Sequence, residues 1–299
     1  MKLKKAMKEI TVSKVIIYLV LIVLALLTIF PFWYVIVGSL TSASTYYSTS
    51  GIMLWPKELD FSSYAYMFSK GWQSPILQGY VTTVGITVIG TAVSMFLTAI
   101  LAYALSRRYL PGHNFMMMVV FFTTIFTSGL IPTYLLINAM KLNNNFWVYI
   151  LPSAISAFNV IVLRNFFQSL PYDLEEAAKI DGASDIRVFV QIILPLAAPG
   201  LATIALFYAV AYWNEWFTAV LYIRDRALWP LQMFMREILI NSDITAMENH
   251  AIIETSVETP PTFSVKGATT IATTLPILVL YPFLQKYFVT GMTMGSIKG

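Results

Sequence analysis

Residues 175–195 read EEAAKIDGASDIRVFVQIILP and gather charges that are scarce elsewhere in the chain. Charged side chains make up 11% of the 299 residues, yet this stretch holds six of them. They are Glu175, Glu176, Lys179, Asp181, Asp185 and Arg187. The stretch lies between two long apolar runs, so it is expected to be a water-exposed connection between buried or membrane-spanning helices.

The same stretch predicts two short helices joined by a turn. Asp173 is placed to cap the first helix, and Glu176 three residues later would complete a capping box. Gly182 suits the left-handed position that ends a helix, and Asp185 would cap a second helix. Residues 164–195, here named the charged loop, are therefore predicted to be a helix–turn–helix.

The composition indicates that the rest of the chain lies in a membrane. Hydrophobic residues make up 58% of the chain, against ~45–50% in soluble domains. Six apolar runs approach the ~20 residues that a membrane helix needs, and they do not alternate as barrel strands do. We therefore predict an all-α polytopic membrane protein with a single transmembrane domain over residues 1–299. The predicted spans are residues 15–37, 81–106, 115–140, 146–163, 196–223 and 267–285.

The distribution of basic residues predicts the orientation. With the N-terminus inside, 12 of the 19 Lys and Arg residues fall on the cytoplasmic side, where such residues accumulate. Both termini and the charged loop are then cytoplasmic. Two long loops, residues 39–80 and 224–266, lie outside.

Motifs for chemistry on a substrate are missing from the sequence. The chain has no cysteine, so thiolate metal sites are excluded. It has no phosphate-binding loop, no Gly-x-Ser-x-Gly elbow and no His-Glu-x-x-His pair. We expect a non-enzymatic chain, so any uphill movement would draw its energy from an ion gradient or from another protein.

The charged loop resembles the cytoplasmic signature of permease subunits of ABC importers. That signature is Glu-Ala-Ala, three residues, Gly, nine residues, Ile, one residue and Leu-Pro, and here every element and gap matches. Residues 281–299, YPFLQKYFVTGMTMGSIKG, and residues 213–216, WNEW, are similar to carbohydrate permeases of the maltose type, in the branch for oligosaccharides and complex sugars. The resemblance implies an ATPase-coupling role for Glu175, Glu176, Ala177, Ala178, Asp181, Gly182, Ile192, Leu194 and Pro195.

The resemblance also implies a setting for the chain. It implies the type I ABC importer fold, a multi-pass subunit of the bacterial cell membrane, and a carbohydrate substrate, an oligosaccharide above all. The implied partners are a second permease subunit in a heterodimer, two cytoplasmic ATPase subunits and an extracytoplasmic sugar-binding protein. ATP and Mg would be bound by the ATPase subunits, and this chain would hold no cofactor.

A second group of residues is a candidate for the translocation path. Glu215 is the ionisable residue well inside a predicted span, where a charge is costly. Aromatic rings beside hydrogen-bonding groups suit a sugar, but they also suit an interfacial aromatic belt with a structural hydrogen bond. Both interpretations stay open for this group. It comprises Asn159, Tyr212, Trp213, Asn214, Glu215 and Trp216.

Two other functions compete with an ABC permease. An ion-coupled secondary transporter would show inverted repeats and a midplane ion site, and the sequence shows no repeat. A membrane scaffold without transport activity would leave the charged loop as a plain connector. The matching signature argues against the scaffold.

Overall fold

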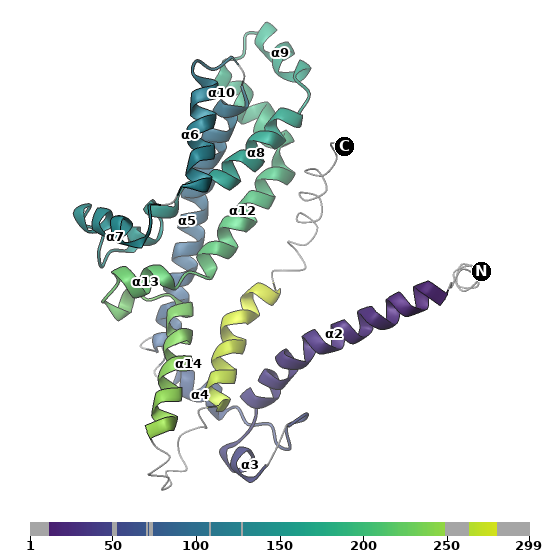
Figure 1. Cartoon of the computed structure of the whole chain (residues 1–299), viewed down its shortest axis with the longest axis vertical. Helices are drawn as coiled ribbons and strands as arrows, with labels where there is room; N and C mark the ends of the chain where they lie inside the picture. The colour runs from purple at the N-terminus through teal and green to yellow at the C-terminus, as the bar shows by residue number, and fades with distance from the viewer. Residues whose placement is uncertain are drawn as a thin grey trace. The chain divides into compact units, whose positions relative to one another are not determined.

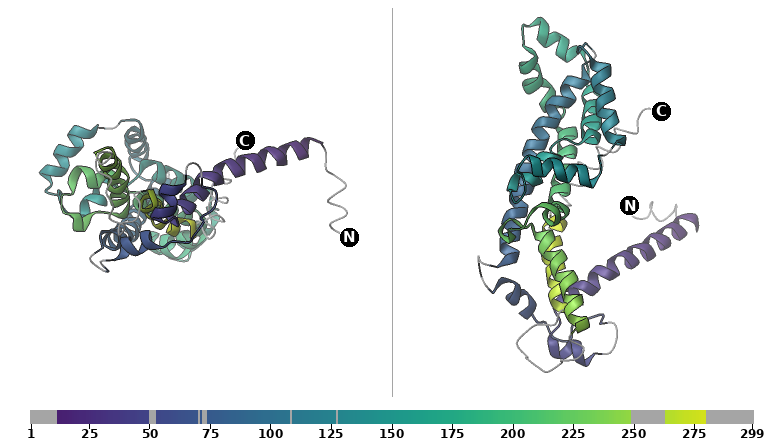
Figure 2. Two further views of the ribbon diagram at one scale, coloured as in Figure 1. Left: turned by 90° about the horizontal axis from the view of Figure 1, so that it is seen from below. Right: turned by 60° about the vertical axis from the view of Figure 1, so that its left-hand side comes forward.

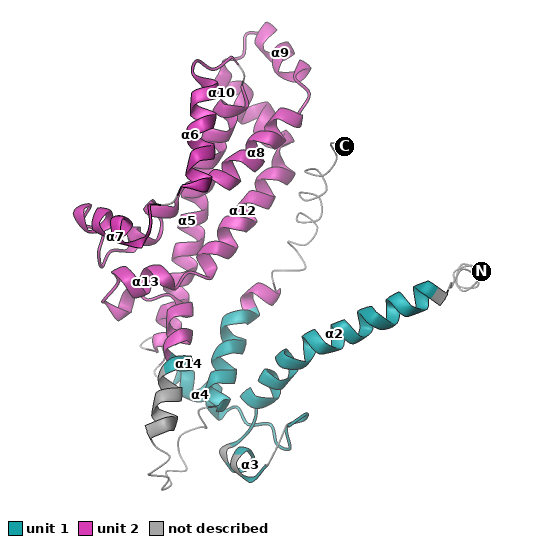
Figure 3. Cartoon of the chain, viewed as in Figure 1, with its two compact units in different colours: residues 1–70, 238–275 teal, residues 71–237, 276–299 magenta. Residues whose placement is uncertain are grey.

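The computed structural model describes residues 12–49, 53–69, 71, 74–107, 109–126, 128–248 and 263–279. Every regular element in these ranges is helical (Figure 1), as the sequence predicted. The chain divides into two compact units (Figure 3). Unit 1 comprises residues 1–70 and 238–275, and unit 2 comprises residues 71–237 and 276–299.

Unit 1 packs the first helix against the last described one. Its elements are α2 (Val12–Ser39), α3 (Ala43–Ser48), α4 (Ser62–Phe68) and residues 263–275 of the helix Phe263–Val279. The Ser264 hydroxyl donates to the Thr41 carbonyl oxygen at 2.9 Å. A Cβ atom added at Gly38 would lie 2.4 Å from the Phe263 ring, so the glycine permits this close approach.

Unit 2 holds the charged loop and most of the helices. Its first elements are α5 (Pro75–Ser106), α6 (His113–Ile125), α7 (Leu130–Ala139), the 3₁₀ turns η3 (Phe146–Tyr149) and η4 (Leu151–Ser153), and α8 (Ala157–Ser169). The next are α9 (Asp173–Ile180), α10 (Asp185–Val188), the π-helical turn η5 (Phe189–Ile193), α11 (Leu194–Leu196) and α12 (Ala198–Trp213). The last are α13 (Phe217–Tyr222), η6 (Arg226–Leu228) and α14 (Leu231–Glu248), which belongs to unit 2 up to residue 237.

The core of unit 2 is built around α5, which packs against α8 and α12 (Figures 1 and 2). Small residues on α5 let α12 approach, and the hydroxyls of Thr98 and Tyr208 lie 2.7 Å apart in a hydrogen bond. One turn along, Ser94 and Tyr212 form the same kind of bond at 2.8 Å. A Cβ atom at Gly90 would lie 2.8 Å from the Tyr212 ring. Small and hydroxyl residues of this kind are typical of helix interfaces in membranes.

The described residues contain two helices that are long and apolar enough to cross a membrane, namely residues 13–39 and α5. The number rises to five if each of three bent helix pairs forms one span. Two bent pairs fall on the predicted spans 115–140 and 146–163, whereas the third bends at residue 197, where the charged loop meets the predicted span 196–223. That span is itself interrupted between α12 and α13. Residues 280–285 of the last predicted span lie outside the described residues.

The interruptions have local causes that a count of apolar residues overlooks. Gly129 precedes α7 with φ of +79°, a conformation that favours glycine. The Ser156 hydroxyl accepts the backbone N–H of Asn159 at 3.4 Å and starts α8 as an N-cap. The Glu215 carboxylate accepts the N–H of Thr218 at 2.8 Å at the start of α13.

Candidate functional site

The charged loop forms the predicted helix–turn–helix, which extends beyond the end of α5 (Figures 1 and 2). The predicted caps are wrong. The first helix has Tyr172 in the N-cap position, without a side-chain cap, because Tyr172 is itself in a right-handed conformation and places Asp173 inside the helix. The second helix is capped by Ser184, whose hydroxyl accepts the N–H of Arg187 at 3.4 Å. Asp185 follows in the first turn, where the helix dipole favours an acid.

The turn between the two helices depends on Gly182, as predicted. Gly182 has φ of +81°. Its N–H bonds to the Lys179 carbonyl at 3.0 Å, and the N–H of Ala183 bonds to the Ala178 carbonyl at 2.9 Å. This pair of bonds is the Schellman motif that ends a helix at a left-handed residue.

The charged loop exposes large apolar side chains among polar ones. Ile180 is 80% exposed and Ile186 is 77% exposed. Glu176, Ala177 and Asp181 are exposed beside them. Exposed apolar surface rimmed by polar residues is typical of a protein–protein interface. The other signature residues lie deeper: Ala178, Ile192 and Leu194 are half-buried, whereas Pro195 is exposed.

Glu175 is the member of the predicted coupling set that lies inside the protein. Its side chain is 1% exposed and forms an ion pair with Arg107, whose Nη2 lies 2.7 Å from the Glu175 Oε2. The Arg107 guanidinium also lies 4.5 Å from the centre of the Tyr103 ring, a favourable cation–π contact. Arg107 is the residue that directly follows α5. This cluster therefore fastens α9 to the end of the long helix.

Lys179 extends the cluster toward solvent. Its ammonium lies 3.5 Å from the Glu175 carboxylate and 3.0 Å from that of Asp185. It also donates to the Tyr109 hydroxyl at 3.2 Å. Burial disfavours the ammonium, but the hydrogen bonds to Asp185 and Tyr109 outweigh it and raise the pKa of Lys179. A raised pKa means that these contacts persist below the ordinary lysine pKa and are lost only as pH rises through the raised one.

The candidate path residues lie where α12 ends and α13 begins, except Asn159, which is buried on α8. Tyr212 and Trp213 are buried. The Asn214 amide donates to the Val210 carbonyl of its own helix at 2.8 Å, and Glu215 starts α13 as described above. Trp216 is 37% exposed, and the Arg236 guanidinium lies 4.8 Å from its ring centre.

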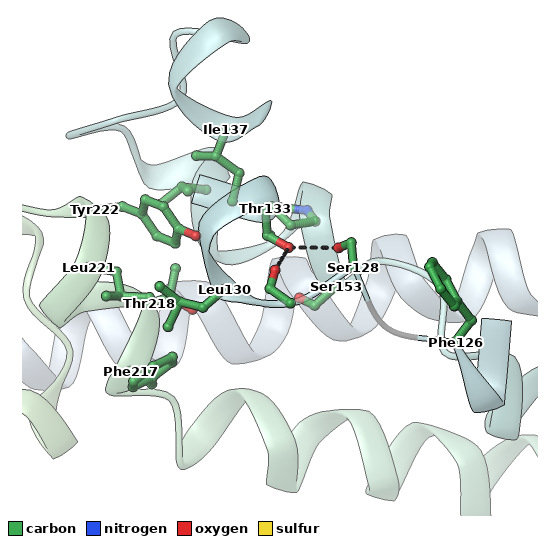
Figure 4. A pocket seen from close by; sticks show the side chains of 13 residues that line it. Phe126, Ser128, Leu130, Thr133, Ile137, Ser153, Phe217, Thr218, Leu221 and Tyr222 are labelled. Carbon is green, nitrogen blue, oxygen red and sulfur yellow. Dashed lines mark hydrogen bonds between the residues drawn. The ribbon is translucent and has the colours of Figure 1, made fainter. Parts of the chain in front are cut away.

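A cavity of about 520 Å³ lies between α7, η4 and α13 (Figure 4). Its residues are Phe126, Ser128, Gly129, Leu130, Thr133, Ile137, Val148, Pro152, Ser153, Phe217, Thr218, Leu221 and Tyr222. The set combines aromatic rings with hydroxyl groups, and no charged side chain is among these described residues. Ser128 and Thr133 already bond to each other at 3.0 Å within it. Its volume lies in the roughly 300–1,000 Å³ range of ligand sites.

None of the predicted path residues lines this cavity. Glu215 is linked to the cavity wall indirectly, because Thr218 donates its backbone N–H to the Glu215 carboxylate and also lines the cavity. The lining residues come from three separate apolar runs, so sequence spacing could not group them. The signal that could have pointed here is the set of helix breaks at Gly129, Pro152 and Glu215.

A resident metal site is not visible in the described part of the chain. No three His, Cys, Asp or Glu side chains lie close enough there to hold a metal ion.

Comparisons with known proteins agree with the resemblance noted in the charged loop. Residues 95–294 match the family described as binding-protein-dependent transport system inner membrane component. The chain is 44% identical over 284 residues to the polygalacturonan/rhamnogalacturonan transport system permease protein YtcP of Bacillus subtilis (strain 168), covering 95% of this chain and 97% of that protein. It is 46% identical to Protein LplC of the same bacterium, covering 91% and 90%.

A solved structure extends the likeness to three dimensions. It is a bacterial ABC transporter involved in the import of the acidic polysaccharide alginate. The match has a TM-score of 0.82 at 29% sequence identity and covers 93% of this chain and 99% of the other. The resemblance to permeases of binding-protein-dependent importers is confirmed.

Proposed function

We propose that this chain, which belongs to the binding-protein-dependent transport system inner membrane components, translocates an oligosaccharide as one permease subunit of an ATP-driven importer. The observation that carries the proposal is the charged loop. It forms two short helices that expose Ile180 and Ile186, and a buried ion pair fastens the first of them to α5. A plain connector needs none of these features.

The energy for transport comes from other subunits of the complex. We infer that two cytoplasmic ATPase subunits bind ATP and Mg, and that one of them receives α9 in a surface cleft. Ile180 and Ile186 would supply apolar contact, and Glu176 and Asp181 would supply charge at the rim. The other partners are a second permease subunit and an external sugar-binding protein that delivers the substrate.

The topology follows from the basic residues and the helix bounds. We propose that both units belong to one permease domain over residues 1–299, with six spans and cytoplasmic termini. The bent pairs at residues 113–139 and 146–169 would each count as one span, α12 and α13 would together form the next, and the helix that begins at Phe263 would be the last. Irregular backbone at membrane depth is tolerated where it lines a cavity or is buried in protein, and the break before α7 lines the cavity.

The sugar would pass along the cavity and the adjoining end of α12. Phe126, Phe217 and Tyr222 offer apolar faces for sugar C–H groups, and Ser153 and Thr218 offer hydroxyls for its polar groups. YtcP and the alginate importer are named for polysaccharides, which favours an oligosaccharide over a single sugar. Trp216 and Asn159 are retained as candidate contacts on the same path.

The test is uptake by the purified complex in proteoliposomes. The chain is co-purified with its partner permease and ATPase subunits in mild detergent, reconstituted, and supplied with the binding protein and labelled oligogalacturonides or neutral oligosaccharides. We expect uptake of an oligosaccharide that requires ATP inside the vesicle and persists when an ionophore removes ion gradients.

Two results would overturn the proposal. Uptake that stops with the ionophore and ignores ATP would indicate an ion-coupled transporter. A complex that contains no ATPase subunit and moves no oligosaccharide would indicate a scaffold.

A further inference from the structure

The attachments of α9 converge on a short segment at the end of α5. Glu175 bonds to Arg107 at 2.7 Å, and Lys179 bonds to the Tyr109 hydroxyl at 3.2 Å. Ala178 adds apolar contact with the core. The remaining residues of α9 point to solvent. A force applied to the exposed side of α9 therefore reaches Arg107 and its neighbours directly, in addition to the connections of α9 to α8 and α10.

The helix that receives this force runs the length of unit 2. α5 has 32 residues, or about 48 Å at 1.5 Å per residue. It is bonded to α12 through Thr98 and Ser94, and near its other end the Thr83 hydroxyl accepts the N–H of Leu231 at 2.8 Å. A displacement of its charged end would thus be felt by α12 and α14 without an intervening loop.

We propose that the Arg107–Glu175 ion pair is the joint through which ATPase closure on α9 moves α5. Glu175 is thereby a positioning residue that faces inward and holds α9 on α5, while the exposed residues of α9 meet the ATPase. The inference rests on the proposed function. It states which contact inside this chain would carry the motion from α9 to α5.

The chemistry of the pair suits a joint better than apolar packing would. Apolar contacts are non-directional, so α9 could slide along α5 and dissipate the motion. The Arg107 and Glu175 charges lie 2.7 Å apart in an ion pair, and pulling the two groups apart would leave each charge buried without its partner. The Tyr103 ring holds the other side of the guanidinium, and Phe189 of η5 packs against that ring at a centroid distance of 4.5 Å. The joint is thus enclosed by groups from α5, α9 and η5.

A purely structural role would look different in the complete complex. If the pair only stabilises the fold, its loss lowers the amount of complex, and each surviving complex transports normally. If the pair is the joint, complexes assemble with ATPase subunits bound, yet hydrolysis and transport are decoupled. The informative readout is therefore sugar transported per ATP hydrolysed, measured per complex.

The variant is Glu175→Gln, which keeps the side-chain shape and removes the charge. Its control is Asp173→Asn, the same chemical change in the first turn of the same helix at an exposed position. We expect Glu175→Gln to lower sugar transported per ATP by roughly twofold to thirtyfold, the range seen for residues on coupling networks. Asp173→Asn should leave the ratio unchanged.

A rescue experiment covers the case in which Glu175→Gln lowers assembly. The chain contains no cysteine, so Arg107→Cys with Glu175→Cys can be bridged by a bifunctional thiol reagent, and mass spectrometry verifies the bridge. We expect the bridged complex to regain transport per ATP and to lose it again when a cleavable bridge is reduced. An equal ratio in bridged, unbridged and wild-type complexes would overturn the joint. Absence of ATP-dependent uptake by the wild-type complex would instead overturn the proposed function.

Discussion

Two regions of α5 make buried polar contacts of different kinds. At the α9 end, Arg107 and Glu175 are held together by full charges. Further along α5, toward α13, the buried polar contacts are neutral hydroxyl pairs, Ser94 with Tyr212 and Thr98 with Tyr208. The same helix thus carries an ion pair just past its end and uncharged bonds within its length.

The difference follows from the solvent around each region. Burying a charge in hydrocarbon is far more costly than burying a hydroxyl that has a partner. The free-energy cost of burying a charged cluster is therefore tolerable only where water can reach the edge of the cluster, as it reaches Lys179. Under the coupling proposed above, the charged contacts lie in the region that would transmit force, and the neutral contacts lie in a helix interface that would rearrange.

The largest expected effect is a difference in stability between variants of two adjacent acids in the charged loop, Glu175 and Glu176. Glu175→Ala leaves Arg107 buried without its carboxylate and should cost about 3–5 kcal/mol. Glu176→Ala removes an exposed carboxylate and should cost less than about 0.5 kcal/mol. The measurement is the free energy of unfolding of the purified chain in mixed micelles titrated with SDS. Equal costs would show that the charged cluster is no stronger than a surface contact.

Two glycine substitutions on α5 test how closely that helix packs against its neighbours. Gly90→Ala places a methyl group against the Tyr212 ring, 2.8 Å away, and should cost about 1–3 kcal/mol by overpacking. Gly85→Ala meets the Phe146 ring at an ordinary 3.7 Å and should be close to neutral. The same SDS titration checks both variants. A neutral Gly90→Ala would mean that α5 and α12 are not in close contact.

Gly182→Val examines the turn inside the charged loop. The left-handed backbone makes a β-branched residue cost roughly 1–2 kcal/mol, although a Cβ atom there would meet no neighbour within 4 Å. The variant should reach the membrane and pair with the partner permease, but bind the ATPase weakly and fail in uptake. Quantitative co-purification of each subunit is the measurement. Normal ATPase retention together with normal uptake would show that the charged loop is only a connector.

The smallest effect is expected for Ser94→Ala. It removes one hydroxyl bond to Tyr212, and such bonds average about 0.6 kcal/mol in membrane proteins. The SDS titration should therefore show a shift well below that of Gly90→Ala. A cost as large as that of Glu175→Ala would erase the contrast between the two regions.

The sequence predicted the helical class and the turn at Gly182, because both depend on local rules. Long apolar runs indicate membrane helices, and a lone glycine after a short amphipathic helix indicates a left-handed end. It missed the caps, since Tyr172 and Ser184 took positions that Asp173 and Asp185 were equally suited to fill. It did not predict the breaks inside three of the apolar runs, because a count of apolar residues does not register a glycine break or a polar cap.

The site was harder to predict because its parts are distant in the chain. The signature located the charged loop, but Glu175 appeared there as one more exposed acid. Its partner Arg107 lies 68 positions earlier and served only to orient the spans. The cavity residues were likewise scattered over three apolar runs. Long-range pairing of this kind leaves no periodic trace in a single sequence.

Site-specific crosslinking in the complete complex tests the central claim, that the exposed face of α9 meets an ATPase subunit. Ala177 is exposed and Ala178 is half-buried against the core, so single cysteines at these neighbouring positions form a matched pair in a cysteine-free chain. A short photoactivatable thiol reagent attached at position 177 should crosslink to an ATPase subunit, and the yield should change when ATP is added. Position 178 should give little or no such product. Equal yields from both positions, or no ATPase product from position 177 in an actively transporting complex, would contradict the account.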